Sequence, residues 1–159
     1  MEANQRIRPA REEDLPEIVA LLADDDLGRD RERTDGPLPD AYLEAFEEIE
    51  RDARNELVVM EEAGRVVATL QLTFIPSLTH RGGERAQVEG VRVSAGHRGT
   101  GVGHRLLEWV VSCAGERGCR MVQLTTDKRR SDARRFYENL GFEATHEGMK
   151  LPLPEQTET

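Results

Sequence analysis

Six residues at positions 98–103, Arg-Gly-Thr-Gly-Val-Gly, combine an arginine with glycines at three alternate positions. Glycine lets a loop fold tightly, so that successive backbone N–H groups can point to the inside of the turn. The apolar residues that follow recur at helical spacing, and the N-terminus of a helix carries partial positive charge. This combination predicts a cradle for a pyrophosphate group.

Phosphate-binding loops that lead into a helix differ in the spacing of their glycines. A Walker loop requires GxxxxGK[ST], and no lysine follows the glycines here, which excludes it. The dinucleotide fingerprint GxGxxG directly follows a strand, whereas here position 104 is histidine and residues 94–98 separate the strand from Gly99. Asp127 stands roughly where a ribose-binding acid would, so an NAD-binding domain stays open as an alternative. The pattern Arg98-x-x-Gly101-x-Gly103 between an extended strand and a helix fits a pyrophosphate better.

The elements around this loop follow the periodicities of a mixed α/β domain. Strands are predicted at residues 5–10, 56–62, 65–75, 85–95, 119–127 and 142–151, with the second and third joined as a hairpin. Helices are predicted at 12–24, 40–53, 102–117 and 131–140. Ser131 is expected as an N-cap, Gly118 and Gly141 as helix ends, and Gly90 as a β-bulge.

Length and composition indicate one globular domain over residues 1–151, followed by a polar tail at 152–159. The chain has 159 residues, of which 37% are hydrophobic and 33% are charged. No apolar run is long enough to span a membrane, and the first residues lack a leader pattern, so we expect a cytoplasmic protein. Cys113 and Cys119 form no CxxC, which argues against a disulfide framework and a metal site.

Charge is distributed unevenly along the chain. The net charge of −9 argues against nucleic acid as a partner. Residues 12–62 hold 19 acidic and 5 basic side chains, whereas residues 96–135 hold 9 basic and 4 acidic ones. One part of the molecule therefore suits phosphates and another suits a cationic ligand, with solvated helix faces as the alternative reading.

Three stretches together resemble the GNAT superfamily of acyl-CoA-dependent N-acetyltransferases. Arg98, Gly101 and Gly103 match its signature [RQ]-x-x-G-x-[GA], and the two other matches are ARRFYENLGF at 133–142 and IRPAREEDLPEIVALL at 7–22. The resemblance covers residues 6–151. It implies a mostly antiparallel, splayed sheet of about six to seven strands flanked by about four helices, and a possible homodimer.

The resemblance also implies acetyl-CoA as co-substrate. Its pyrophosphate would rest on the glycine loop and the start of the following helix, and its pantetheine arm would pair with the preceding strand. Residues of the 131–140 helix would pack near that arm. The implied binding residues are Val91, Arg92, Val93, Arg98, Gly99, Thr100, Gly101, Val102, Gly103, His104, Ala133 and Phe136.

For catalysis, the resemblance places a tyrosine at Tyr137 to protonate the leaving thiolate and a carboxylate at Glu89 to take the proton of the amine. The backbone N–H of Val93 could stabilise the oxyanion. His80 and His97 are rival bases by residue type. Tyr137 and Glu89 also distinguish an enzyme from a non-catalytic acetyl-CoA sensor, which would more readily have lost one of them.

The acceptor is predicted to be a small-molecule amine, and the acidic bias favours a cationic one such as an aminoglycoside, a polyamine or an amino-acid derivative. Candidate contacts are Asp24, Asp25, Asp26, Glu47 and Glu48. A protein N-terminus or lysine stays open as an alternative acceptor. The chain departs from the family at Arg130, where many members carry asparagine, and the basic residues 128–130 are a candidate contact for the 3′-phosphate of the nucleotide.

Overall fold

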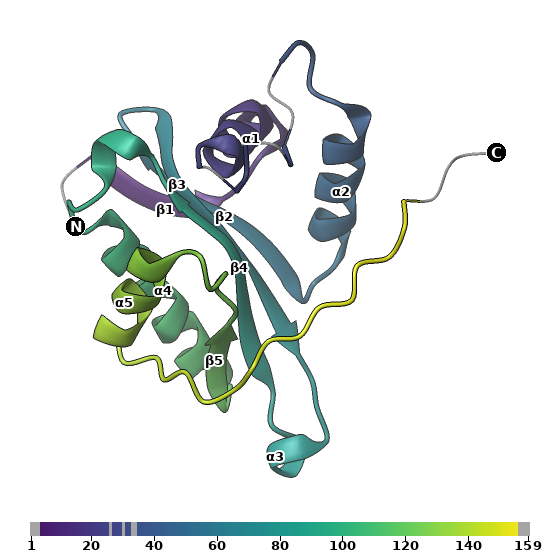
Figure 1. The fold of residues 1–159 in the computed structure, drawn as a ribbon, viewed down its shortest axis with the longest axis vertical. Helices are drawn as coiled ribbons and strands as arrows, with labels where there is room; N and C mark the ends of the chain where they lie inside the picture. The colour runs from purple at the N-terminus through teal and green to yellow at the C-terminus, as the bar shows by residue number, and fades with distance from the viewer. Residues whose placement is uncertain (1–3, 26, 30, 33–34, 156–159) are drawn as a thin grey trace. The chain divides into compact units, whose positions relative to one another are not determined.

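The computed structural model describes residues 4–25, 27–29, 31–32 and 35–155. It divides into two compact units, Met1–Leu124 and Thr125–Thr159, and each is described by itself. The first unit holds a five-stranded sheet in the order β1-β2-β3-β4-β5 (Figure 1). The strands are β1 (Gln5–Pro9), β2 (Asn55–Glu62), β3 (Arg65–Ile75), β4 (Arg85–Val93) and β5 (Met121–Leu124).

The sheet is mixed, as predicted. The first three neighbouring pairs are antiparallel, and β4 pairs with β5 in parallel. The β2–β3 hairpin turns at Ala63 and Gly64, whose φ angles of 49° and 80° are those of the type I′ turn that matches strand twist. The residues of β3 from Val66 to Leu70 are all buried, which requires cover on both faces of the sheet.

Helices supply that cover. The helices of this unit are α1 (Leu15–Ala23), α2 (Asp40–Arg51), the single turn α3 (Thr79–Gly82) and α4 (Val102–Arg117). Short 3₁₀ turns, η1 (Glu12–Asp14) and η2 (Ala95–His97), precede α1 and the glycine loop. In Figure 1, α1 and α2 lie on one side of the sheet and α4 lies on the other. The buried side of α4 is the predicted one: Val102, Leu106, Leu107, Val110 and Ala114.

The second unit contains α5 (Ser131–Asn139) followed by an extended segment. Ser131 is the first residue of the helix and not its N-cap, which is Arg130, so that expectation was wrong by one residue. Gly141 has a φ of 99° just past the helix, as a C-terminal glycine should.

The predicted count of six to seven strands was too high. Residues 142–151 are all described, and they form no strand. The segment is exposed except for Phe142, and Gly148 and the prolines at 152 and 154 disfavour a regular ladder. The segment has no continuous apolar face to fix it against a sheet, which explains why the predicted strand does not form.

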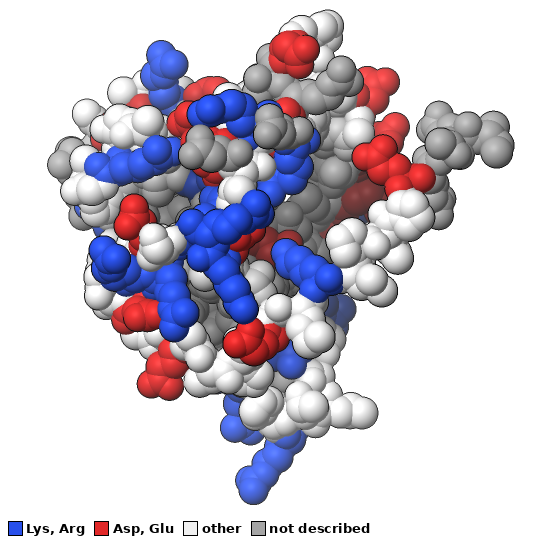
Figure 2. Space-filling model, viewed as in Figure 1, with Lys and Arg blue, Asp and Glu red and all other residues white. Residues whose placement is uncertain are grey.

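Charges of both signs share the surface. The face drawn in Figure 2 carries lysine and arginine side chains as well as aspartate and glutamate side chains. Within the described residues, no helix is long and apolar enough to cross a lipid bilayer. Cys113 and Cys119 are both free thiols, and burial raises the pKa of each.

Candidate functional site

The glycine loop is a series of tight turns between β4 and α4. The amide of His97 donates to the carbonyl of Ser94 (2.9 Å), and the amide of Thr100 donates to the carbonyl of His97 (3.3 Å). Gly99 and Gly101 have φ angles of 76° and 89°, a conformation that is strained for any residue with a Cβ. The loop therefore requires glycine at two of the three positions that the sequence pattern singled out.

The third glycine lies in the first turn of α4. Gly101 is the N-cap, and the first amide to bond within the helix is that of Arg105, which donates to the carbonyl of Gly101 (3.0 Å). The amides of Val102, Gly103 and His104 precede it and therefore have no partner within the helix. Three such donors at the positive end of a 16-residue helix suit an anionic group.

Strand β4 leads into this loop and is interrupted by the predicted bulge. Glu89 pairs with Gln71 and Arg92 pairs with Thr69, so two residues of β4 lie opposite one residue of β3. Gly90 has a φ of 63° at this point. The bulge confirms the role that the sequence predicted for Gly90.

Past the bulge, one edge of β4 extends beyond its ladder with β5. That parallel ladder ends at the pair Val88–Leu124, while β4 continues to Val93. The amide of Ser94 donates to the carbonyl of Val67 in β3 (2.8 Å). Because successive N–H groups of a strand point to opposite edges, the N–H of Val93 points away from β3, toward the side where the ladder has ended.

Two arginines cap carbonyl groups of this part of β4. Arg92 donates from Nη1 to the carbonyl of Val91 (2.8 Å), and Arg98 donates from Nε to the carbonyl of Val93 (3.3 Å). Both arginines also reach the end of α1. Arg92 pairs with Asp25 (3.3 Å), and Arg98 pairs with Asp24 (3.6 Å). The start of the α1–α2 connection is thereby held against the glycine loop.

These ion pairs change the interpretation of the acidic residues at 12–62 as contacts for a cationic amine. Asp24 and Asp25, two of the candidate amine contacts, already face arginines. Glu48 pairs with Arg51 in the next turn of α2 (2.6 Å), and Glu47 is exposed on the same helix. Asp26 lies outside the described residues. The acidic bias of residues 12–62 is thus partly offset by basic side chains of the glycine loop and of β4.

The candidate catalytic groups lie on different units. Glu89 is exposed on β4 next to the bulge. Tyr137 is half-buried on α5, where its ring meets Phe136 edge-on (centroids 5.2 Å apart) and Phe142 (5.8 Å). Ala133 and Phe136 are half-buried on the same helix. The encounter of Tyr137 with Glu89 remains a prediction.

The two rival histidine bases occupy different surroundings. Both ring nitrogens of His97 are held by hydrogen bonds, to Ser94 and to Glu62. His80 lies in α3, in the connection that precedes β4, and so at the opposite end of that strand from Val93. In the second unit, Lys128 pairs with Glu147 (3.2 Å) and Arg129 with Asp127 (2.7 Å). Lys128 and Arg129, which were proposed to contact the 3′-phosphate of the nucleotide, therefore already form ion pairs.

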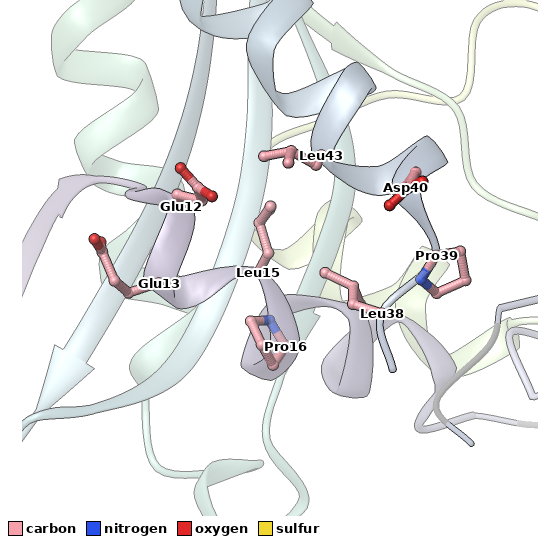
Figure 3. A pocket seen from close by; sticks show the side chains of 8 residues that line it. All are labelled: Glu12, Glu13, Leu15, Pro16, Leu38, Pro39, Asp40 and Leu43. Atoms are coloured by element: carbon pink, nitrogen blue, oxygen red, sulfur yellow. The ribbon is translucent and has the colours of Figure 1, made fainter. Parts of the chain in front are cut away.

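Sequence reasoning missed a pocket of about 410 Å³ between the N-terminal ends of α1 and α2. Leu15 and Leu43 face one another in it, with Glu12 and Glu13 to one side and Asp40 to the other (Figure 3). The remaining lining residues are Pro16, Leu38 and Pro39. Acidic residues are common at helix starts, where they interact with the partial positive charge, so their residue type alone does not indicate this pocket.

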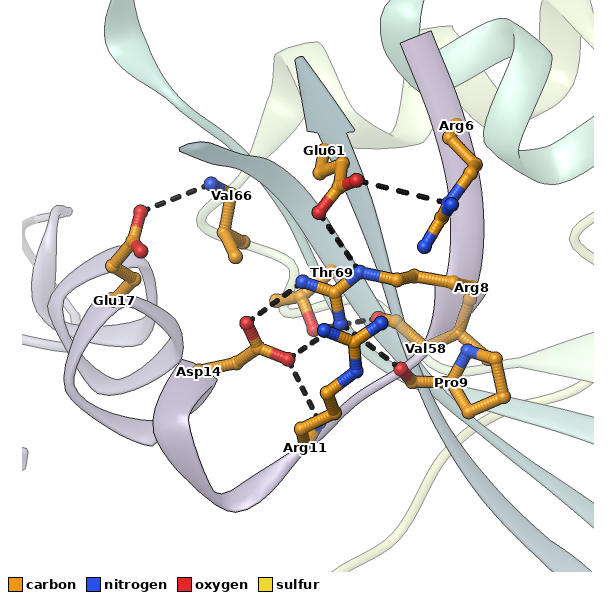
Figure 4. Close-up of polar contacts among 10 residues, drawn as sticks. All are labelled: Arg6, Arg8, Pro9, Arg11, Asp14, Glu17, Val58, Glu61, Val66 and Thr69. Carbon is orange, nitrogen blue, oxygen red and sulfur yellow. Dashed lines mark hydrogen bonds and ion pairs between the residues drawn. The ribbon is translucent and has the colours of Figure 1, made fainter. Parts of the chain in front are cut away.

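A buried ion pair fixes the η1 wall of this pocket. Arg8 on β1 donates to both carboxylate oxygens of Asp14 (2.7 and 2.9 Å) and to Glu61 on β2 (2.9 Å), as Figure 4 shows. The side chains of Arg8 and Asp14 are only 10% and 9% exposed. The hydrogen bonds from Arg8 lower the pKa of Asp14, so its carboxylate stays charged at neutral pH.

The described part of the chain contains no cluster of three or more side chains suited to hold a metal ion. The glycine loop and the end of β4 instead present backbone amides and two arginines, with Glu89 exposed next to the bulge. Such groups suit an anionic ligand and proton transfer.

Known proteins match this chain over most of its length. A family model described as the acetyltransferase (GNAT) family matches residues 16–142. A transcriptional regulator from Bacillus halodurans C-125 is 52% identical over 94% of this chain and 99% of its own, with a TM-score of 0.91. An acetyltransferase from Trypanosoma brucei is 28% identical over 94% and 99% of the two chains, with a TM-score of 0.74.

A more distant structure shares the fold. A predicted acetyltransferase from Clostridium acetobutylicum, solved with acetyl-CoA, is 21% identical over 93% of this chain and 96% of its own, with a TM-score of 0.72. A search of curated proteins found no match.

Proposed function

The chain belongs to the GNAT acetyltransferase family and is an acyl-CoA-dependent acetyltransferase, and on that premise we propose that it acetylates the primary amine of a cationic small molecule. The observation that carries the proposal is the junction of β4 with the glycine loop. There the strand continues past its ladder with β5 to Val93, and the three helix-start amides of Val102, Gly103 and His104 follow after the glycine loop. The first feature suits an extended pantetheine arm, and the second suits a pyrophosphate.

The residues present fit acetyl-CoA at this junction. The amides of Val102, Gly103 and His104 would bind the pyrophosphate together with the Arg98–Gly101 turn. A Cβ placed on Gly99 would meet no atom within 4 Å, so the space beside the loop is open to a ligand. Val91, Arg92 and Val93 would pair with the pantetheine arm, and Ala133 and Phe136 would pack against it.

When bound, acetyl-CoA supplies the thioester, and the chain supplies position and proton transfer. The amine nitrogen forms a bond to the thioester carbonyl carbon, the N–H of Val93 stabilises the oxyanion, and the carbon–sulfur bond then breaks. Glu89 takes the proton that the amine loses, directly or through water. Tyr137 gives its proton to the departing thiolate.

The acceptor class rests on charge. Excess acidity in residues 12–62 persists after the pairs with Arg92 and Arg98 are counted, because Glu12, Glu13 and Asp40 line the pocket between α1 and α2. A cationic amine with an apolar part would match both its carboxylates and its leucines. Asp24, Asp25, Asp26, Glu47 and Glu48 are further candidate contacts.

The test is a turnover assay of the purified protein with acetyl-CoA against aminoglycosides, polyamines, amino-acid derivatives and anionic amines. We expect acetylated product with cationic amines at kcat/KM at least about 10-fold above that for aminoalkylphosphonates. Preference for the anionic amines would overturn the acceptor class. Glu89→Gln should lower kcat without changing acetyl-CoA affinity, whereas Glu116→Gln, an exposed glutamate near the end of α4, should change neither.

A second candidate function has one observation in its favour. The 52% identical relative is described as a transcriptional regulator. A regulatory module of this fold would bind acetyl-CoA and turn over no small amine, or would acetylate a lysine or N-terminus of a protein partner. Product formation with a free small-molecule amine separates the proposed enzyme from both alternatives.

A further inference from the structure

His97 is held from two sides at the entrance to the glycine loop. Its Nδ1 lies 2.7 Å from the hydroxyl of Ser94, and its Nε2 lies 2.5 Å from a carboxylate oxygen of Glu62, at the end of β2. The side chains of His97 and Glu62 are only 28% and 27% exposed. Hydrogen bonds from Gln5 and from His97 lower the pKa of Glu62, so the carboxylate accepts and Nε2 donates. In the neutral ring, Nδ1 then accepts from Ser94.

The same carboxylate connects to the far end of the loop. The side-chain amide of Gln5, which is buried at the start of β1, donates to Glu62 (3.0 Å). The amide oxygen of Gln5 accepts from Nη2 of Arg105 in the first turns of α4 (2.7 Å). Residues Ser94, His97, Glu62, Gln5 and Arg105, here called the loop brace, therefore tie both ends of the loop to the same corner of the sheet.

Gly101 is part of this arrangement. A Cβ on Gly101 would lie 2.9 Å from Nη1 of Arg105, so the guanidinium occupies the space beside the glycine that precedes the helix. A loop built on Gly99 and Gly101 has more conformational freedom than other loops, and binding a ligand with it costs the entropy of ordering it. Contacts that order the loop in advance remove that cost from the binding free energy.

We propose that His97 and Glu62 are positioning residues, which hold the glycine loop in the conformation that binds the pyrophosphate of acetyl-CoA. They act through the backbone of residues 98–104 and touch no reacting atom. The inference rests on the proposed function in that acetyl-CoA is the ligand, and it assigns to His97 a role other than general base.

The test compares acetyl-CoA with acetyl-pantetheine, which lacks the pyrophosphate, by calorimetry and by steady-state kinetics. His97→Ala should raise Kd and KM for acetyl-CoA about 10-fold and change kcat at saturation less than about twofold. Its KM for acetyl-pantetheine should match that of the wild type. His97→Gln, whose side-chain amide can still donate to Glu62, should recover most of the acetyl-CoA affinity. His146→Ala, an exposed histidine of the second unit, serves as the matched control and should behave as the wild type.

Coupling between the two residues gives a second measurement. Because His97 and Glu62 are hydrogen-bonded to one another, the effects of His97→Ala and Glu62→Gln on acetyl-CoA affinity should be non-additive. The Kd of the double variant should be close to that of the single variant that binds acetyl-CoA more weakly. Glu62→Gln also retains the side-chain shape if His97→Ala fails to fold.

Several results would overturn the proposal. One is unchanged acetyl-CoA affinity in folded His97→Ala and Glu62→Gln, and another is an equal loss for acetyl-CoA and acetyl-pantetheine. A loss of kcat with unchanged KM would instead identify His97 as the base. A wild type that binds acetyl-CoA but acetylates no amine would contradict the proposed function alone. The comparison of acetyl-CoA affinities would still test whether the loop brace contributes to binding. A wild type that fails to bind acetyl-CoA would contradict both.

Discussion

Arg98 is the signature residue whose side chain connects two parts of the first unit. It donates to the carbonyl of Val93 and pairs with Asp24, so one guanidinium connects the β4 edge to the end of α1. Both members of the ion pair are about half exposed. A pair of this kind is worth about 0.2–1 kcal/mol, which is small enough for a pyrophosphate to compete with Asp24 for Arg98.

Asp24→Asn should therefore tighten acetyl-CoA binding. Removing the carboxylate takes away the ion-pair partner of Arg98, which keeps its hydrogen bonds to the backbone carbonyls of Val93 and Asp24, and reduces repulsion of the phosphates. Kd should therefore fall by roughly two- to fivefold in low salt and by less at high salt. Calorimetry at two ionic strengths measures this. Glu50→Gln, which removes an exposed carboxylate of α2, should leave Kd unchanged. Weaker binding by Asp24→Asn would show that Asp24 orders Arg98 and does not compete for it.

Tyr137→Phe tests the general acid. Removing the hydroxyl should lower kcat by about 100-fold or more, because the thiolate then leaves without its proton donor, while acetyl-CoA affinity stays within about twofold. Tyr42, the second of the chain's two tyrosines, provides the control. Tyr42→Phe removes a hydroxyl that lies 3.3 Å from Glu32 and should retain activity. Equal kcat in both variants would remove Tyr137 from the mechanism.

At the scale of elements, the bulge in β4 is the feature that links strand geometry to the site. Gly90→Ala should destabilise the fold by about 1–2 kcal/mol, because the positive φ is strained for alanine although the nearest atom to its Cβ, on Leu22, is 3.8 Å away. Gly64→Ala, in the β2–β3 turn with a φ of 80°, should cost a similar amount. Thermal unfolding should show a similar loss of stability in both variants, whereas only Gly90→Ala should raise the KM for acetyl-CoA. An unchanged KM would mean that the bulge plays no part in binding.

Local patterns were enough to predict most elements. The hairpin at Ala63 and Gly64, the apolar face of α4 and the bulge at Gly90 each depend on a few neighbouring residues. The strand predicted at residues 142–151 does not form, because the segment has no continuous apolar face to pack against a sheet. The loop brace was not predictable, because Gln5 and Arg105 are 100 residues apart and only the fold brings them together.

Some features of the candidate site could also be predicted from the sequence, and others could not. The sequence predicted a tightly folded glycine loop, and Gly99 and Gly101 have the positive φ values that such a loop requires. The ion pairs that Asp24 and Asp25 form with arginines could not be predicted, because an acidic run in a sequence does not indicate which basic side chains will lie next to it. The pocket beside Leu15 and Leu43 also went unseen, since it depends on how two consecutive helices pack against one another, which residue types alone do not give.

For the whole molecule, the Arg8–Asp14 pair links global stability to pH. Its side chains are buried, and breaking it by Asp14→Asn should cost about 3 kcal/mol at pH 7. The pKa of Asp14 is lowered in the folded state, so its contribution is complete above the ordinary carboxyl pKa of about 4 and is lost as pH falls through the folded value. Denaturant unfolding should therefore show the wild type and Asp14→Asn converging below about pH 4.

The exposed pair of α2 gives the control. Glu48→Gln, whose partner is Arg51, should change the free energy of unfolding by less than about 0.5 kcal/mol at any pH. A gap between the wild type and Asp14→Asn that stays constant down to pH 2 would show that the carboxylate charge contributes nothing.

The central claim is that the glycine loop of an acetyltransferase holds the pyrophosphate of acetyl-CoA, and the most direct test is a thermodynamic cycle. Binding of acetyl-CoA and of acetyl-pantetheine is measured calorimetrically for the wild type, Gly101→Ala and Gly115→Ala, the last at a helix glycine whose Cβ would meet no atom within 4 Å. The wild type and Gly115→Ala should prefer acetyl-CoA by at least about 100-fold, and Gly101→Ala should lose most of that preference while binding acetyl-pantetheine normally. Equal preference in all three proteins would contradict the account.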